Sequence, residues 1–265
     1  MMTEERKTIL VTGATGGIGS AVCNQLAKAN YSLVCVARDV VKLGSMCDQL
    51  SSNYPGTYIW MSVDMTNDAS ILEFSEELSA RKISLDGAVL MPPQVPPTNN
   101  PLPSSEAWRE ILQNSFVGPL ALLKVAIAAM KPNLSMGKRA KIAIISGISS
   151  AQVLGHYATS NVIRLAWLAQ AKTLAFALGE QGFHINTLSL GGTLTPHYND
   201  SLKERAHKAG MTLEQRLVEE TANIPLKKYG TPKEVAKAVE GLLSEFSDHI
   251  TGMNIMCDGG FTRAY

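Results

Sequence analysis

A glycine-rich segment near the amino end of the chain has the residue types needed to hold a phosphate group. Residues 12–19 read TGATGGIG and lie between an apolar run and a helical stretch. Glycines let the backbone turn tightly and approach a ligand, and a helix N-terminus offers free N–H groups and a positive dipole end. The segment predicts a site for a dinucleotide pyrophosphate, with a ligand-free tight turn as the alternative. The candidate contacts are Gly13, Thr15, Gly17, Ile18 and Gly19.

The end of the second apolar run carries the residues that would choose between NAD and NADP. The run ends in Val-Ala-Arg-Asp at positions 36–39. A carboxylate at this place binds the ribose 2′-hydroxyl of NAD, whereas an arginine suits the 2′-phosphate of NADP. Arg38 matches the arginine pattern. Asp39 is a competing signal, but it also suits the N-cap of a following helix. The sequence favours NADP(H).

Seven short apolar runs alternate with longer helical stretches along the chain. Several runs are almost continuously apolar, which is typical of parallel strands buried on both faces. The alternation predicts a doubly wound α/β sheet. The expected strands are 8–12, 32–38, 57–64, 85–91, 141–146, 184–190 and 253–257. The expected helices include 17–29, 69–80, 106–130, 157–179 and 232–246.

Two segments between these elements are expected to be irregular. Residues 91–103 contain six prolines, which cannot form a helix. Residues from 195 to about 225 form a long excursion with one polar helical stretch, in the place where α/β folds put substrate-binding loops. No linker divides the chain, so we expect one domain over residues 1–265 with a substrate-loop insertion at about 195–225.

Composition narrows the class of protein. The chain of 265 residues is 45% hydrophobic and 18% charged, which excludes an intrinsically disordered protein. Its net charge of +1 gives no sign of the excess positive charge that is typical of nucleic-acid-binding proteins. The short acidic start is unlike a signal peptide, and no run reaches the roughly 18 apolar residues of a membrane span. The four cysteines form no CxxC pair, so we expect reduced cysteines, no metal site and a cytoplasmic location.

At this point the chain resembles the short-chain dehydrogenases/reductases, in particular their ketoacyl reductase-like members, from about residue 8 to residue 260. Its TGxxxGxG pattern, the VDMTN and NSFVG segments, Tyr157 and the SLGGTLTP segment carry the resemblance. The resemblance implies a Rossmann-like, seven-stranded parallel sheet flanked by helices. It implies catalytic roles for Tyr157, Ser146 and Asn114. It further implies cofactor contacts from Asp64, Met65, Thr193 and Thr195.

The chain also departs from the family pattern at three motifs. The family's tyrosine is followed four residues later by lysine, but here that residue is Asn161. The family's NNAG reads LMPP at 90–93, and its PG reads LG at 190–191. Ser146 lies eleven residues before Tyr157, slightly closer than usual. Ser149 and Ser150 are rival candidates, and Gly147 could itself occupy the serine position.

The missing lysine favours reduction over oxidation. A cation near a tyrosine favours the tyrosinate, and an ordinary tyrosine has a pKa of about 10. A neutral tyrosine is a poor base, but it can give a proton to a carbonyl oxygen. Asn161 could still bond the nicotinamide ribose. Arg164, three residues after Asn161 on the same helical face, either replaces the lost charge or lies at an interface.

The sequence therefore predicts an NADPH-dependent reductase of a ketone, aldehyde or β-ketoacyl-type substrate, with Tyr157 as proton donor and a small-molecule substrate as partner. Two alternatives remain. One is a catalytically impaired NADP(H)-binding homologue that acts as a sensor or partner subunit, and the other is a non-redox enzyme on the same fold. Neither nucleic acid nor a membrane is an expected partner. A homodimer or homotetramer is expected from the resemblance.

Overall fold

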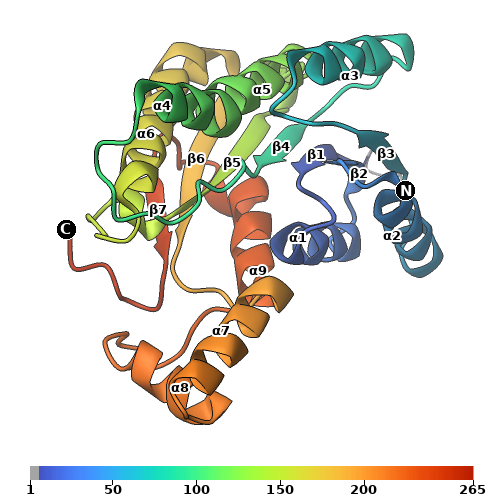
Figure 1. Ribbon diagram of the computed structural model, residues 1–265. Helices are drawn as coiled ribbons and strands as arrows, with labels where there is room; N and C mark the ends of the chain where they lie inside the picture. Colours follow the sequence, from blue (N-terminus) through green and yellow to red (C-terminus); the bar gives the residue numbers. More distant parts are fainter. Residues whose placement is uncertain (1–5, 265) are drawn as a thin grey trace.

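Seven parallel strands form one sheet in the order β3-β2-β1-β4-β5-β6-β7 (Figure 1). The structure is a computed structural model that describes residues 6–264. The strands are β1 (Thr8–Thr12), β2 (Ser32–Ala37), β3 (Tyr58–Ser62), β4 (Gly87–Leu90), β5 (Ala140–Gly147), β6 (Phe183–Leu190) and β7 (Asn254–Cys257). The doubly wound parallel sheet and its seven expected strands are confirmed, with ends that differ by up to two residues.

The apolar strands are buried because helices cover both faces of the sheet. Successive strand residues point to opposite faces, so Ile9 and Val11 join one core cluster while Leu10 joins the other. Helices α1, α2 and α9 pack on one face, and α3, α5 and α6 pack on the other (Figure 1). The helices are α1 (Gly17–Lys28), α2 (Val40–Asn53), α3 (Asp68–Ala80), α4 (Ser105–Leu112), α5 (Gly118–Ala128), α6 (Ala158–Leu178), α7 (Pro196–Lys208), α8 (Leu213–Thr221) and α9 (Pro232–Leu243).

The strand order reverses at β1, which pairs with β2 on one side and β4 on the other. A crevice at the carboxyl ends of the strands, beside such a switch point, is where α/β sheets bind ligands. The glycine-rich turn follows β1 and the proline-rich loop follows β4, so both lie at this edge.

The long helix expected over 106–130 is wrong in detail. It divides into α4, a π-helical turn at Gln113–Val117, and α5. Pro119 causes the break, because it has no N–H to donate to the carbonyl of Ser115. That carbonyl accepts instead from Nε1 of buried Trp167 at 2.8 Å.

Two further helical expectations change and one is confirmed. Tyr157, expected as the first residue of a helix, is the N-cap residue that precedes α6. Asp39 caps a following helix, as expected: its Oδ1 accepts from the Lys42 N–H at 3.0 Å at the start of α2. The excursion at 195–225 contains two helices, α7 and α8, which project away from the sheet (Figure 1).

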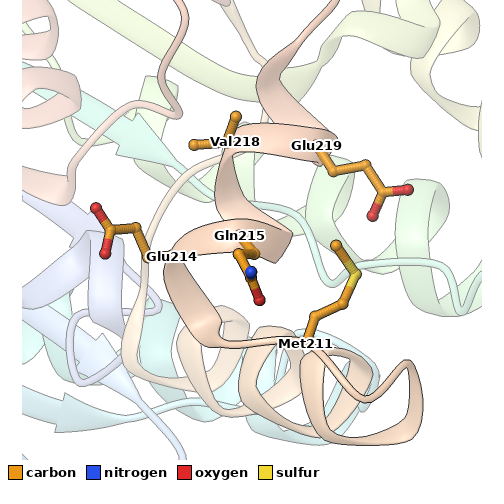
Figure 2. A pocket seen from close by; sticks show the side chains of 5 residues that line it. All are labelled: Met211, Glu214, Gln215, Val218 and Glu219. Atoms are coloured by element: carbon orange, nitrogen blue, oxygen red, sulfur yellow. The ribbon is translucent and has the colours of Figure 1, made fainter.

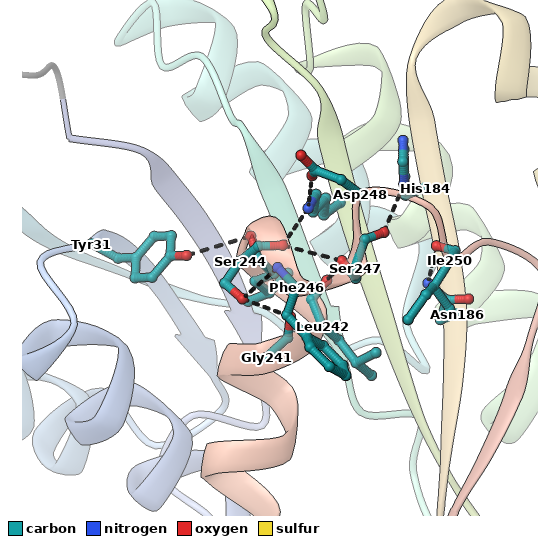
Figure 3. Close-up of polar contacts among 12 residues, drawn as sticks. Tyr31, His184, Asn186, Gly241, Leu242, Ser244, Phe246, Ser247, Asp248 and Ile250 are labelled. Atoms are coloured by element: carbon teal, nitrogen blue, oxygen red, sulfur yellow. Dashed lines mark hydrogen bonds and ion pairs between the residues drawn. The ribbon is translucent and has the colours of Figure 1, made fainter.

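A polar cluster closes the amino edge of the sheet, opposite the crevice. Lys141 near the start of β5 is 5% exposed and pairs with Asp248 at 2.6 Å, and its Nζ also donates to the Ser244 carbonyl. His184 in β6 contacts the Ser247 carbonyl at 3.2 Å (Figure 3). These contacts fix the segment after α9 to the strands, and no candidate site residue takes part in them.

Two apolar segments, Ser105–Ala128 and Ala158–Gln181, are long and apolar enough to cross a membrane by length and composition alone. The α5 part of the first segment and α6 in the second pack against the sheet, which is the usual place of core helices in this architecture. All four cysteines are free thiols. Within residues 6–264, no group of three or more His, Cys, Asp or Glu side chains is placed to hold a metal ion. The expectation about a signal peptide concerns mainly residues 1–5, outside the described residues.

Candidate functional site

The glycine-rich turn leaves an open helix N-terminus at the carboxyl end of β1. Gly13 has φ of +59°, which favours glycine, and its carbonyl accepts from the Gly16 N–H at 2.9 Å. A Cβ on Gly19 would lie 2.1 Å from that carbonyl oxygen. Among the described residues, no side chain caps the start of α1. The first N–H groups of α1 are therefore available to an anion.

The end of β2 presents Arg38 to solvent beside this turn. Asp39 is committed to Lys42, through the N-cap hydrogen bond and an ion pair of 3.0 Å. The hydrogen bond from the Lys42 N–H is the largest cause of the lowered pKa of Asp39. Arg38 makes no side-chain hydrogen bond or ion pair with any residue of the described chain. Its charge helps to lower the pKa of nearby Asp64 and is available to a ligand.

Asp64 lies in the loop after β3, and its side chain is held by hydrogen bonds within that loop. Its Oδ1 accepts from the N–H and the hydroxyl of Thr66, at 2.9 and 2.8 Å. The backbone bond from Thr66 is the main cause of its lowered pKa. The backbone of Met65, the next residue, packs against Gly118 at the start of α5. A Cβ on Gly118 would lie 2.0 Å from the Met65 carbonyl oxygen. The tight contact fixes this loop against the start of α5.

The segment after β6 closes over the glycine-rich turn. A Cβ on Gly17 would lie 2.9 Å from Pro196 Cδ and 3.0 Å from Thr195 Cβ. Thr195 caps α7 by accepting from the Tyr198 N–H, and Thr193 is buried. The structure thus brings together two predicted cofactor segments that are about 180 residues apart in the chain.

A partly buried carboxylate, Glu220, supports this segment through Tyr229. A Cβ on Gly192 would lie 2.3 Å from the ring of Tyr229, whose hydroxyl donates to Glu220 at 3.0 Å. Glu220 also accepts from Arg205 at 2.8 and 2.9 Å and from Arg216 at 2.7 Å. Burial raises the pKa of Glu220, but these hydrogen bonds lower it by more. Sequence reasoning missed this network. The i,i+4 spacing of Arg216 and Glu220 could have indicated one pair, but the partners Arg205 and Tyr229 lie outside α8.

The proline-rich loop joins the two ends of the candidate site. At its start, the Met91 N–H donates to Thr12 Oγ1 at 2.7 Å. Further along, Thr98 exchanges backbone hydrogen bonds of 3.0 Å with His156 and Ala158. Ser160 Oγ donates to the Val95 carbonyl at 3.3 Å. The loop is ordered by these bonds and forms a wall from the glycine-rich turn to the start of α6.

Asn161 faces the loop before α6. Its Nδ2 donates to the Leu154 carbonyl at 3.1 Å, and its Oδ1 accepts from the Leu154 N–H at 3.4 Å. Tyr157 lies one turn earlier, and its carbonyl accepts from the Asn161 N–H at 2.8 Å. The Asn161 amide is therefore engaged by the backbone, and its role toward a cofactor stays a prediction.

Arg164 reaches the end of β5. Its Nη1 donates to Ser149 Oγ at 3.0 Å, and its guanidinium carbon lies 5.3 Å from the centre of the Tyr157 ring. A Cβ on Gly147 would lie 2.5 Å from that carbon. Burial lowers the pKa of Arg164. A serine, a cation and a tyrosine thus meet at the carboxyl edge of the sheet.

The other serine candidates differ in their surroundings. Ser150 belongs to a buried network, with Ser189 Oγ at 2.8 Å and Asn254 Nδ2 at 3.3 Å. Ser146 Oγ is buried without a hydrogen-bond partner among the described residues. Asn114 lies in the π-helical turn, an irregularity that is frequent at functional sites. The catalytic roles of Ser146 and Asn114 stay predictions.

A surface hollow elsewhere does not belong to this site. It is lined by Met211, Glu214, Gln215, Val218 and Glu219 (Figure 2). All five lie on α8 or just before it, and none is a predicted site residue. The hollow is a feature of the projecting helices only.

Comparison with known proteins agrees with this geometry. The family described as enoyl-(acyl carrier protein) reductase matches residues 13–262. The chain is 28% identical to a 3-oxoacyl-[acyl-carrier-protein] reductase of Rickettsia felis, over 96% of both chains. It is 26% identical to a D-beta-hydroxybutyrate dehydrogenase of Rhizobium meliloti, over 97% of this chain and 98% of the relative.

Solved structures agree on the fold. L-sorbose reductase of Gluconobacter frateurii, complexed with NADPH and L-sorbose, superposes with a TM-score of 0.89 at 22% identity over 98% of both chains. The family match, the parallel sheet and the glycine-rich turn at its switch point lead to one assignment. The chain belongs to the short-chain dehydrogenase/reductase family of oxidoreductases.

Proposed function

We propose that this protein is an NADPH-dependent reductase of a small-molecule carbonyl compound. The observation that carries the proposal is the uncapped start of α1 above a turn with no room for side chains, next to the unpaired Arg38. A pyrophosphate fits the first feature and a 2′-phosphate fits the second. An NADPH-bound reductase among the structural neighbours supports the same cofactor.

The residues around the crevice are of the kinds that would hold this cofactor. Gly13, Thr15, Gly17, Ile18 and Gly19 would surround the pyrophosphate. Arg38 would bind the 2′-phosphate, Asp64 and Met65 would flank the adenine, and Thr193 and Thr195 would hold the carboxamide. Bound there, NADPH would supply a hydride.

The chain's own part in the reaction is to hold the carbonyl and to supply a proton. Tyr157 lies at the start of α6, beside Arg164. We assign it as the donor of the proton to the carbonyl oxygen. The π-helical turn that contains Asn114 and the serines after β5 complete the surroundings of the site.

A second candidate function has one observation in its favour. The Asn161 amide is engaged with Leu154, and the family's lysine is missing. A cofactor-binding subunit that lacks turnover would show the same features. This alternative predicts tight NADPH binding without reduction of any carbonyl. A non-redox reaction on the same fold predicts product formation without net consumption of the cofactor.

We also propose that the protein forms a homodimer or homotetramer through α5 and α6. Apolar side chains are uncovered on the outer face of α6 and in the π-helical turn just before α5. They include Val162 (51%), Leu165 (58%) and Phe176 (83%) on α6, and Val117 (48%) in the turn. Burying such side chains against a second copy is favourable. The free cysteines suit a reducing, cytoplasmic location.

Titration of the purified protein with NADPH and with NADH, followed by nicotinamide fluorescence, tests the cofactor. Arg38→Ala should weaken NADPH binding by about tenfold or more, since a charge-assisted hydrogen bond contributes about 1.5–3 kcal/mol. It should leave NADH binding unchanged. Lys28→Ala, at the far end of α1, is the matched control. Equal affinity for both cofactors in the unaltered protein would contradict the choice of NADP(H).

A panel of ketones, aldehydes and β-ketoacyl thioesters, assayed by NADPH oxidation, tests the reaction. Tyr157→Phe should lower the rate by at least about 100-fold, the usual contribution of a positioned acid. NADPH affinity should change little in this variant. An unchanged rate in Tyr157→Phe would remove Tyr157 from the mechanism.

A further inference from the structure

Arg164 is a partly buried cation without an opposite charge. Its one side-chain hydrogen bond goes to the neutral Ser149 hydroxyl. Within residues 6–264, no carboxylate lies at ion-pair distance from its guanidinium. Buried charges in proteins are normally paired, so an unpaired one at the mouth of a crevice indicates a ligand as its partner.

The strand end beside Arg164 is built to admit it. Gly147 is the last residue of β5, and a Cβ there would lie 2.5 Å from the guanidinium carbon and from Nη1. Any other residue at this position would push the guanidinium away. The absence of a side chain at Gly147 and the position of Arg164 are therefore linked. An interface arginine on the outer face of α6 would require no such space.

The spacing within α6 points to the same residue. In the family, a cation follows the catalytic tyrosine by four residues. Asn161 holds that position relative to Tyr157, but it is neutral and its amide is turned to Leu154. Arg164 lies three residues after Asn161, on the next turn of the helix, and it is the first cation of α6. Its guanidinium reaches the Tyr157 ring, so it is the cation of α6 that lies beside the tyrosine.

We propose that Arg164 is the positively charged residue of the active site and that Gly147 and Ser149 position it. This inference rests on the proposed reductase function. In the reduction, a hydride from NADPH forms a bond to the carbonyl carbon, and the Tyr157 hydroxyl gives its proton to the oxygen. Arg164 transfers nothing. Its fixed charge and remaining N–H donors stabilise the negative charge that develops between the carbonyl and phenol oxygens.

Three variants of the full-length protein test the proposal. Arg164→Ala should lower kcat/KM for the best carbonyl substrate by about 100-fold, the range for loss of one stabilising donor. Arg164→Lys, which keeps the charge, should retain more of the activity than Arg164→Ala. Lys172→Ala removes an exposed cation from the same helix and should stay within twofold. Added guanidinium or ethylguanidinium at millimolar concentration should restore activity to Arg164→Ala by tenfold or more, which a merely structural role would not allow.

Gly147→Ala provides a test that leaves Arg164 in the chain. The added methyl group should displace the guanidinium and lower kcat/KM by about tenfold or more, with the fold kept according to circular dichroism. Arg164→Ala or Gly147→Ala at the rate of the unaltered protein would overturn the proposal, and so would a loss that guanidinium cannot rescue. If the unaltered protein reduces no carbonyl, the proposed function fails instead, so the two failures are distinguishable.

Discussion

Replacing Asn161 by the family's lysine should lower the stability of this protein and should not raise its kcat. If Asn161 were only a lost catalytic residue, Asn161→Lys would raise activity. The structure predicts the opposite, because the Asn161 amide fixes the Leu154 backbone just before Tyr157. A lysine cannot accept the bond from the Leu154 N–H, and its charge would lie three residues from Arg164 on the same face.

The size of the effect follows from the lost contacts. The bond to the Leu154 carbonyl has a good length of 3.1 Å, and such bonds contribute about 1 kcal/mol. The second bond, at 3.4 Å, contributes a smaller amount. Repulsion between like charges at this spacing adds about 0.2–0.5 kcal/mol. The sum is about 1.5 kcal/mol, which corresponds to a Tm lowered by roughly 3–6 °C at this chain length.

Thermal unfolding and carbonyl reduction should be measured on the same preparations. Asn161→Ala is the matched control, since it loses both bonds without adding a charge. We expect Asn161→Ala to lose most of the stability that Asn161→Lys loses, and neither variant to exceed the unaltered protein in kcat. A tenfold higher kcat in Asn161→Lys would refute this reasoning and would remove Arg164 as the replacement cation.

Two further predictions concern stability. Glu220→Gln should lower the free energy of unfolding by about 2 kcal/mol, since charged hydrogen bonds contribute about 1.5–3 kcal/mol each and its arginine partners are partly solvated; an unchanged urea midpoint would contradict it. Burial lowers the pKa of His184, and the hydrogen bond from Lys141 lowers that of Asp248. Stability should therefore fall as the pH drops below about 6.5, where unfolded histidine gains a proton, and again below about 4, where unfolded aspartate does. His184→Gln should remove part of the first decline and leave the second.

The fold could be predicted because its signals are local. The apolar runs are strands, and the glycine-rich turn stands between β1 and α1 as expected. The N-cap at Asp39 could also be read from neighbouring residues. Each of these features depends on residues within a few positions of one another, so composition and spacing suffice.

The irregular parts of the helices were harder to predict for a physical reason. The π-helical turn before α5 depends on Pro119 and on a distant partner, Trp167, which takes the freed carbonyl of Ser115. Tyr157 precedes α6 because residues on both sides of it, His156 and Ala158, pair with the proline-rich loop. Tertiary contacts decide both features, and the local sequence does not contain them.

The candidate site shows the same division. The residues around the glycine-rich turn were identified from a continuous motif, whereas the surroundings of Arg164 come from three separate segments. Gly147 gives space, Ser149 gives a hydrogen bond and Tyr157 gives a ring face. From the sequence alone, a place for Arg164 at an interface or on the surface was the favoured interpretation. Only the clash that a Cβ on Gly147 would make shows that β5 and α6 are matched at this point.

The fit between Gly147 at the end of β5 and Arg164 on α6 connects two departures from the family pattern. The lysine is replaced by Asn161, and the strand ends in a residue without a side chain. A side chain at Gly147 would push the Arg164 guanidinium out of its place, and a neutral residue at 164 would remove the cation beside Tyr157. A chain that merely lost its lysine would have no reason to keep both features. Their combination, next to a glycine-rich turn that still has room for a pyrophosphate, favours a site with rearranged chemistry over an abandoned one.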